Sequence, residues 1–571
     1  MNVTHLRLII ASSACFVLIG PASAVASNPC PRFAPGSTVT QAPDLFSDDG
    51  VLTVNLAYQT APGSNGSPLY CFTTPEGAES PTLHVFPGDT LIVNVTNTLP
   101  TPTTAGSMTP VTTASTVCGA TVQNASSVNV HYHGTNTSPS CHSDEVIHTL
   151  INSGQTFQYR ISFPSDEPPG LYWYHPHVHG LAETAVQGGA SAAIVVRGIA
   201  NVQPAVAGLP EQIFLVRDQQ TPPNSPPIGS TLPGGGIQPS WDLSVNYVQI
   251  LASNGFIPAQ LRMKPGQRQF WRVSNSCADT ILDLQLVYDG VPQTMQVVGL
   301  DGVPTGSQDG TRRGTLVPVT DIRVPPASRV EFIMTGPSAS VKSAIFQTLN
   351  INTGPDGDTD PQRPIIAIQT NPFAPDPAAT IGPAGTPGPQ RFEGLASATP
   401  TATRTLYFSE INANQQFFIT VDGQTPTLFS PNNPPAITTT QGSVEDWIIQ
   451  NRSLENHEFH LHQVHFLLLE RNGVPVPPSQ QQFLDMVEVP FGTGAPPYPS
   501  VKVRADFRGP DIGDFVYHCH ILNHEDNGMM AIIRVLPNDA AAKPANTVPP
   551  AVAKPQTKTT AVALLLTGRK D

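Results

Sequence analysis

The sequence predicts an all-β protein built from three related sandwich or barrel domains. Many short apolar runs are bounded by Gly, Pro, Asn or Asp, and none shows a long helical period. A turn followed by an apolar run also recurs three times at nearly equal spacing. With 61 prolines and 45 glycines in 571 residues, long continuous helices are not expected. We therefore expect a Pro- and Gly-rich chain of short strands.

The repeated pattern is a turn glycine followed nine residues later by asparagine. Gly88, Gly266 and Gly442 are separated by 178 and 176 residues. The asparagines that end the three runs are Asn97, Asn275 and Asn451. A matched offset at so regular a spacing favours three homologous domains over three unrelated β-turns. We place them at residues 27–198, 199–380 and 390–540.

Further strands are predicted wherever a short apolar run ends at a turn residue. The stretches 198–208 and 371–389 are rich in small residues and proline and are expected to be linkers. The expected strands include Thr82–Val85, Leu91–Val95, Phe157–Phe163, Ala193–Val196, Ile213–Val216, Arg329–Met334, Thr405–Phe408 and Met530–Val535.

The two ends of the chain look unlike the rest. Residues 1–26 are typical of a secretory signal peptide, which indicates a secreted or periplasmic protein. Residues 541–571 are expected to be a disordered tail, and no other apolar stretch is long enough to span a membrane. Six cysteines remain after cleavage, and Cys118 with Cys141 is the best candidate for a disulfide. A net charge of −14 without a basic run argues against nucleic-acid binding.

Ten of the sixteen histidines fall in four clusters, all outside the middle domain. Alternate residues of a strand share a face, so each His-x-His offers two imidazoles on one side. One such pair is often incidental, but four in one chain predict a metal site. The clusters are His131-Tyr-His133, His175-Pro-His177, His457-Glu-Phe-His460-Leu-His462 and His518-Cys519-His520-Ile-Leu-Asn-His524.

The last cluster indicates which metal is bound. Cys519 must face away from His518 and His520, so it can serve a separate ion. Two histidines, a cysteine thiolate and a weak methionine form a blue-copper site, here from His457, Cys519, His524 and Met529. We expect a bend or bulge to turn His457 away from the face of His460. Zinc is the alternative metal for a Cys/His set, but it has little use for methionine.

The other eight histidines form four pairs, two from each outer domain. Eight imidazoles suit three copper ions, which would lie at the interface of domains one and three. The middle domain has Leu284-Gln-Leu286 where domain three has His460-Leu-His462. We expect it to be a copper-free spacer.

These motifs resemble the copper signatures of the three-domain multicopper oxidases, the family of laccases, ascorbate oxidase, bilirubin oxidase and bacterial copper-efflux oxidase. The resemblance covers residues 30–540 and implies three cupredoxin-like Greek-key β-barrels with four copper ions per chain. It assigns type 1 copper to His457, Cys519, His524 and Met529, and type 2 copper to His131 and His460. It assigns the type 3 pair to His133, His175, His177, His462, His518 and His520.

The sequence departs from that family at a few positions. Glu458 follows His457 where the family usually has proline, and Gln463-Val464 stand where many laccases have Gly-His. Neither change removes a ligand. Methionine-rich segments of the copper-efflux enzymes are absent, which argues against Cu(I) as the main substrate.

The resemblance implies one-electron oxidation of phenols or aromatic amines, coupled to four-electron reduction of O₂ to water. We expect Asp144 and Glu525 to supply protons, and Asp485 to be a carboxylate on the substrate side. The axial methionine favours a low to middle type 1 potential. The alternatives are a metal-ion oxidase acting on Fe(II) or Cu(I), and a copper-binding protein without turnover. We expect a monomer that needs only O₂ and a small reducing substrate.

Overall fold

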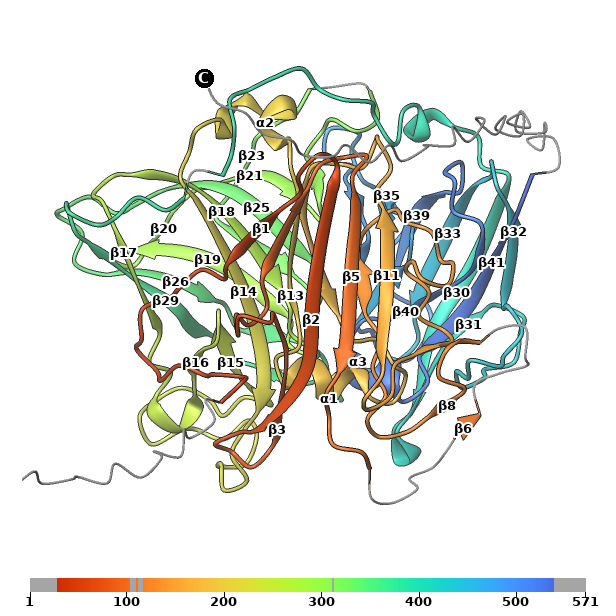
Figure 1. The fold of residues 1–571 in the computed structure, drawn as a ribbon, viewed down its shortest axis with the longest axis horizontal. Helices are drawn as coiled ribbons and strands as arrows, with labels where there is room; N and C mark the ends of the chain where they lie inside the picture. The colour runs from red at the N-terminus through yellow and green to blue at the C-terminus, as the bar shows by residue number, and fades with distance from the viewer. Residues whose placement is uncertain (1–27, 103–108, 111–116, 311–312, 379, 539–571) are drawn as a thin grey trace, which may run out of the picture.

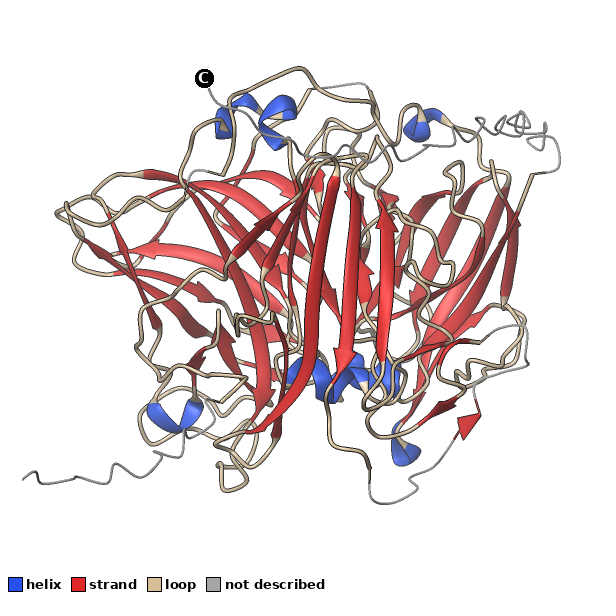
Figure 2. Cartoon of the chain, in the orientation of Figure 1, coloured by secondary structure: helices blue, strands red, loops and turns tan. Residues whose placement is uncertain are grey.

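The computed structural model describes residues 28–102, 109–110, 117–310, 313–378 and 380–538. Regular structure in these residues is mostly β-strand, with a few short helices (Figure 2). The strands form three cupredoxin-like β-barrel domains, as expected. In Figure 1 the orange strands of the first domain lie between the green strands of the second and the blue strands of the third. The expected signal peptide at 1–26 and tail at 541–571 lie outside the described residues.

The first domain consists of two main sheets, in the orders β1-β4-β13-β12-β9 and β11-β5-β2-β3. Buried aliphatic and aromatic side chains from both sheets form its core. Its elements are β1 (Asp44–Phe46), β2 (Val51–Pro62), β3 (Pro68–Thr73), β4 (Thr82–Val85), β5 (Thr90–Asn97), β6 (Thr109–Pro110), β7 (Cys118–Gly119), β8 (Val122–Gln123), β9 (His131–His133), β10 (Thr149–Leu150), β11 (Thr156–Ser162), β12 (Gly170–His175), α1 (Ala182–Gln187) and β13 (Ala192–Val196).

The second domain has sheets in the orders β16-β15-β14-β18-β25-β21-β22 and β17-β29-β26-β19-β20. The predicted linker at 198–208 contains α2 and η1. The elements are α2 (Ile199–Val202), η1 (Pro204–Val206), β14 (Glu211–Gln220), β15 (Trp241–Val245), β16 (Val248–Ile250), η2 (Ala252–Asn254), β17 (Ala259–Met263), β18 (Arg268–Asn275), β19 (Leu282–Tyr288), β20 (Val291–Pro292), β21 (Met295–Leu300), β22 (Val303–Pro304), β23 (Val317–Val319), β24 (Asp321–Val324), β25 (Arg329–Thr335), β26 (Ala344–Thr348), β27 (Ile351–Asn352), β28 (Thr359–Asp360) and β29 (Arg363–Thr370).

The third domain has sheets in the orders β31-β30-β33-β39-β35-β36 and β32-β41-β40-β34-β38. Among the described residues, the second predicted linker, 371–389, holds no helix or strand. The elements are η3 (Leu395–Ser397), β30 (Ala402–Ile411), η4 (Asn412–Asn414), β31 (Gln416–Val421), β32 (Ile437–Thr440), β33 (Val444–Asn451), β34 (His457–Leu461), β35 (Phe466–Arg471), β36 (Val474–Pro475), β37 (Phe483–Leu484), β38 (Met486–Val489), β39 (Ser500–Asp506), β40 (Gly513–Cys519), α3 (Leu522–Asp526) and β41 (Met530–Leu536).

The repeated strand occupies the same place in all three domains. β5, β18 and β33 each pair in parallel with an earlier strand, which is β2, β14 or β30. Each also pairs antiparallel with a later strand, which is β11, β25 or β39. The turn glycines Gly88, Gly266 and Gly442 have φ angles of 91°, 67° and 95°, a region that favours glycine. The predicted internal repeat is confirmed.

The asparagine that ends each repeated strand is buried and makes the same three hydrogen bonds. Its Nδ2 donates to two backbone carbonyls, and its Oδ1 accepts from the backbone N–H two residues later. These distances lie between 2.6 and 3.1 Å for Asn97, Asn275 and Asn451. A buried amide is stable only when its polar atoms are paired. The asparagine therefore fixes the loop that follows the strand in each domain.

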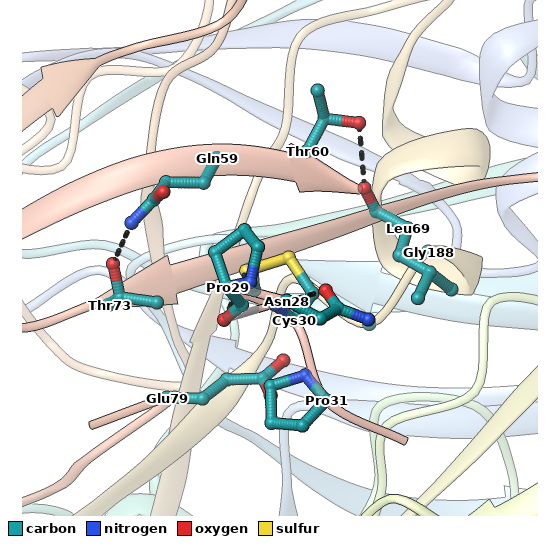
Figure 3. The surroundings of a disulfide bond; sticks show 12 residues. Asn28, Pro29, Cys30, Pro31, Gln59, Thr60, Leu69, Thr73, Glu79 and Gly188 are labelled. Atoms are coloured by element: carbon teal, nitrogen blue, oxygen red, sulfur yellow. Dashed lines mark hydrogen bonds between the residues drawn. A yellow bond between two sulfur atoms is a disulfide. The ribbon is translucent and has the colours of Figure 1, made fainter. Parts of the chain in front are cut away.

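Two disulfides constrain the first domain. The predicted Cys118–Cys141 bond is present. A second bond, Cys30–Cys71, ties the N-terminal segment to β3 and lies beside Pro31 and Glu79 (Figure 3). Cys277 and Cys519 are buried and form no disulfide.

Candidate metal centre

The four His-x-His pairs lie at the ends of four strands in the two outer domains. β9 carries His131 and His133 beside β12, and its register places His131 opposite His175. β34 lies beside β40 in the third domain, where His460 is opposite His518. The second member of three pairs follows just after its strand: His177, His462 and His520.

These eight imidazoles converge across the interface between the first and third domains. The ring of His131 stacks on His462, with 3.9 Å between ring centroids, and His133 stacks on His460 at 4.1 Å. The Nε2 atom of His518 lies 3.1 Å from Nε2 of His462 and 3.3 Å from Nε2 of His177. All eight residues are at most 1 % exposed. The predicted position between the outer domains agrees with this geometry.

Several nitrogen atoms of these buried rings lack hydrogen-bond partners among the described residues. Nε2 of His131, His175 and His460 accepts or donates no hydrogen bond among the described residues, and neither does Nδ1 of His133 or His462. Buried polar atoms are rarely left unpaired in native proteins. Close, unpaired imidazole nitrogens are what a group of bound metal ions would satisfy, so the residues fit copper.

The opposite nitrogen of several rings is held by the protein. Nδ1 of His131 lies 3.0 Å from Asp144 Oδ1, and Nδ1 of His460 lies 2.8 Å from the Asp485 carbonyl oxygen. The Nδ1 atoms of His175 and His518 lie 2.9 Å from the carbonyl oxygens of Pro176 and Cys519. Such contacts set the tautomer and orientation of a metal-binding imidazole.

Burial favours the neutral form of several of these imidazoles. It lowers the pKa of His175 to about 3 and that of His177 to about 4, and neighbouring histidines contribute to both shifts. The pKa values of His131, His460 and His462 are also well below the ordinary value, mainly because of burial. Neutral rings keep a lone pair free for a metal ion.

A second cluster lies within the third domain. The Nδ1 atoms of His457 and His524 are 3.1 Å apart, and each lies 3.7 Å from Sγ of Cys519. Met529 is fully buried. Its carbonyl oxygen accepts a hydrogen bond from the backbone N–H of Cys519, and its own N–H donates to the carbonyl oxygen of His524. Two imidazoles and a thiol around one point match the trigonal His₂Cys set of blue-copper sites.

Strand alternation separates the two clusters. His518 faces the eight-histidine cluster while Cys519 faces His457, as predicted. The bend or bulge expected at His457 is absent, because β34 pairs with β38 from His457 to His460 without a register shift. An odd spacing of three residues already places these two histidines on opposite faces.

All three predicted acids adjoin the eight-histidine cluster, and two of them contact its imidazoles without an arginine partner. Asp144 contacts His131 and also accepts from Gln463 Nε2 at 2.8 Å. Glu525 lies 3.0 Å from Nδ1 of His518 and 3.6 Å from Nδ1 of His177. Burial raises the pKa of Glu525, but these imidazoles outweigh it and hold the pKa well below the usual value.

Asp485 does not lie where a substrate-side carboxylate was expected. It is 1 % exposed, and both of its oxygens bind Arg329 at 2.8 and 2.6 Å. Its Oδ1 also lies 3.3 Å from Nε2 of His133. The residue is therefore an interior ion-pair partner beside the eight-histidine cluster, rather than an acid that meets substrate.

An acidic cleft of about 480 Å³ opens beside His524, between the second and third domains. His524 is 5 % exposed, whereas His457 and Cys519 are fully buried. No Lys, Arg, Met or Cys lines the cleft among the described residues. Its titratable lining residues are Asp279, Asp356, Asp358, Asp360, Glu455 and His524.

The sequence did not identify several residues that shape the site. Arg329 was visible only as a charged residue at the start of a predicted strand, and its partner Asp485 lies 156 positions away in the sequence. Gln463 adopts φ 59°, a conformation that glycine accepts more readily. This accounts for the glycine that many laccases have at that position, and the side chain of Gln463 instead holds Asp144.

Comparisons with known proteins agree with this geometry. Two family models described as multicopper oxidase match residues 116–199 and 398–539. The multicopper oxidase MmcO of Mycobacterium tuberculosis is 25% identical over 513 residues, which are 84% of this chain and 86% of that protein. A laccase of Bacillus subtilis is 23% identical over 405 residues, with coverage of 64% and 71%.

Solved structures share the fold. A Campylobacter jejuni multicopper oxidase, described as a metallo-oxidase, superimposes with a TM-score of 0.63 at 20% identity, covering 88% of this chain and 96% of that one. A laccase-like multicopper oxidase of Ochrobactrum sp., described as active towards lignin model compounds, gives 0.62 at 19% identity, with coverage of 87% and 100%.

Proposed function

Because the chain belongs to the multicopper oxidase family, we propose that it takes single electrons from small phenols or aromatic amines and passes them to O₂. The observation that carries this proposal is the arrangement of two buried clusters joined by one tripeptide, His518-Cys519-His520. We further propose that the protein is exported and acts as a monomer, since one chain supplies every ligand.

The proposed ligand sets follow the two clusters. His457, Cys519, His524 and Met529 would hold type 1 copper. His131 and His460 would hold type 2 copper, and the other six histidines of the eight would hold the type 3 pair, giving four ions per chain. Bound there, copper supplies one-electron transfer at the first site and reduction of O₂ to water at the second. The unpaired imidazole nitrogens support this assignment.

The chain's own residues would connect, orient and protonate these sites. Cys519 is bonded through the backbone to His518 and His520, which gives electrons a covalent route between the clusters. Asp144 orients His131 through its Nδ1 atom. Glu525, in contact with His518 and His177, is placed to accept a proton and pass it on beside the cluster. Burial of the eight histidines excludes bulk water from the reaction.

The division of labour between the domains is part of the proposal. Residues 27–198 and 390–540 would supply all copper ligands, and residues 199–380 contain no histidine. The strand β19 of the middle domain carries buried Leu284 and Leu286 instead. Middle-domain residues would nevertheless line part of the acidic cleft, and Arg329 of this domain binds Asp485.

The acidic cleft favours a second candidate function, oxidation of metal ions. The acidic residues near His524 would attract cations and disfavour anionic donors. Burial nevertheless raises the pKa of Asp279, Asp360 and Glu455 and so reduces their charge at neutral pH. Oxygen ligands suit Fe(II), whereas Cu(I) prefers sulfur, and the cleft has no methionine among the described residues. Protonated aromatic amines would benefit from the same charge, so the cleft supports either kind of cationic donor.

Oxygen uptake by the copper-loaded protein tests both candidates. A methoxyphenol, an aromatic diamine, Fe(II) and Cu(I) would each be offered as the donor. The proposal expects uptake with the organic donors at four electrons per O₂, without accumulation of peroxide. Uptake with Fe(II) alone would establish the second candidate instead. A blue, copper-loaded protein that consumes no O₂ with any donor would contradict both.

A further inference from the structure

The backbone N–H of Glu458 points at the sulfur of Cys519. Glu458 follows His457 on β34, and its amide nitrogen lies 3.4 Å from Cys519 Sγ in hydrogen-bonding geometry. Its side chain is fully buried, and neither carboxylate oxygen has a hydrogen-bond partner among the described residues. The multicopper oxidases usually have proline at this position, and a proline has no N–H to donate. Glu458 therefore provides a donor that a proline would not.

A hydrogen bond to the ligand sulfur changes the energy of electron transfer at a copper–thiolate site. The N–H draws electron density from sulfur, which weakens the donation of that density to copper. Cu(II) depends on this donation more than Cu(I) does, so the oxidised state loses more stability. Hydrogen bonding around the cysteine sulfur is accordingly one of the factors that set the reduction potential of such sites.

We propose that the N–H of Glu458 raises the reduction potential of the Cys519 site above the value set by its four ligands alone. The inference rests on the proposed type 1 site. In the step concerned, the donor loses one electron and the copper held by Cys519 goes from Cu(II) to Cu(I). No bond to sulfur is broken, and no proton is transferred at that atom. Glu458 is thus a positioning residue that acts through Cys519.

The N–H of Glu458 is a single donor that one substitution can remove. Replacing residue 458 by proline removes this donor and leaves the four proposed copper ligands unchanged. Residue 457 lies in an extended strand, which is the conformation required before proline. The site can therefore accept a proline at 458 without a change in strand direction.

The test is a redox titration of the blue absorption in wild type, Glu458→Pro and Glu458→Gln. The proline variant removes both the N–H and the carboxyl group, whereas the glutamine variant keeps the N–H and replaces only the carboxyl group. We expect the one-electron equilibrium of Glu458→Pro to shift about threefold to tenfold towards Cu(II), where tenfold corresponds to about 59 mV. Glu458→Gln should titrate within about twofold of wild type.

Three results would overturn the inference. The potential of Glu458→Pro could equal or exceed that of wild type, or Glu458→Gln could shift as far as Glu458→Pro. If Glu458→Pro fails to load copper, the structure of the copper-loaded wild type shows instead whether the N–H of Glu458 is directed at the Cys519 sulfur. An N–H of Glu458 directed away from sulfur there would contradict the inference, and one directed at sulfur would support it. A wild type without blue absorption would instead refute the proposed type 1 site.

Discussion

The guanidinium of Arg329, on β25 of the middle domain, binds both carboxylate oxygens of Asp485 in the third domain, at 2.8 and 2.6 Å. Asp485 in turn lies 3.3 Å from His133 in the first domain. Three domains therefore meet at one buried carboxylate. The middle domain supplies no histidine to the metal centre, yet it holds the acid that adjoins one of the proposed ligands.

Arg329→Met should destabilise the fold strongly. It leaves the buried carboxylate of Asp485 without its cation, which costs about 3–5 kcal/mol. Chemical denaturation of the copper-free protein measures the loss. The matched control is Arg323→Met, because Arg323 is 39 % exposed in its ion pair with Glu488 and should contribute at most about 1 kcal/mol. Equal losses in the two variants would contradict the importance of the buried pair.

Asp144→Ala should weaken copper binding at the eight-histidine cluster. The aspartate fixes His131 through Nδ1, and loss of such a contact typically lowers metal affinity about 10- to 100-fold. Competition against a chelator gives the affinity, and the blue absorption of the separate cluster should remain. Glu145→Gln is the neighbouring control, and its copper affinity should match wild type. Unchanged affinity in Asp144→Ala would exclude the orienting role.

Parts of the fold and of the metal centre could be predicted from the sequence where they depend on residues that are close together in the chain. The eight histidines and Cys519 were identifiable because strand alternation fixes their faces locally. The repeat was identifiable because Asn97, Asn275 and Asn451 each serve a loop that follows directly in the chain.

Long-range pairings were not predictable in the same way. The Arg329–Asp485 pair and the Cys30–Cys71 bond depend on how distant segments pack. The role expected for Asp485 failed for that reason, since its position in the chain says nothing about burial by another domain. The acidic cleft is likewise assembled from loops of two domains.

The double substitution Asp356→Asn and Asp358→Asn should weaken the use of cationic donors. Each lost charge removes on the order of 1 kcal/mol of attraction near a solvated cleft. KM for a cationic amine or Fe(II) should then rise about thirtyfold, while KM for a neutral phenol stays unchanged. Glu76→Gln, at an exposed residue outside the cleft, is the control. Equal effects on neutral and cationic donors would argue against an electrostatic role for the cleft.

Removal of the Cys118–Cys141 bond by Cys118→Ala and Cys141→Ala should lower stability by about 2–4 kcal/mol. The bond closes a segment of 23 residues that contains β9 and therefore His131 and His133. Thermal unfolding of the copper-free double variant gives the change. A midpoint equal to wild type would mean that the bond contributes nothing measurable to this domain.

The most direct test of the central claim is the replacement of Cys519 by serine, measured by blue absorption, copper content and O₂ uptake. Cys277→Ser is the matched control, since Cys277 is the other buried free cysteine and lies outside both clusters. We predict that Cys519→Ser loses the blue absorption, one of four copper ions and all turnover, while Cys277→Ser keeps all three properties. Blue colour and turnover retained in Cys519→Ser would contradict the account.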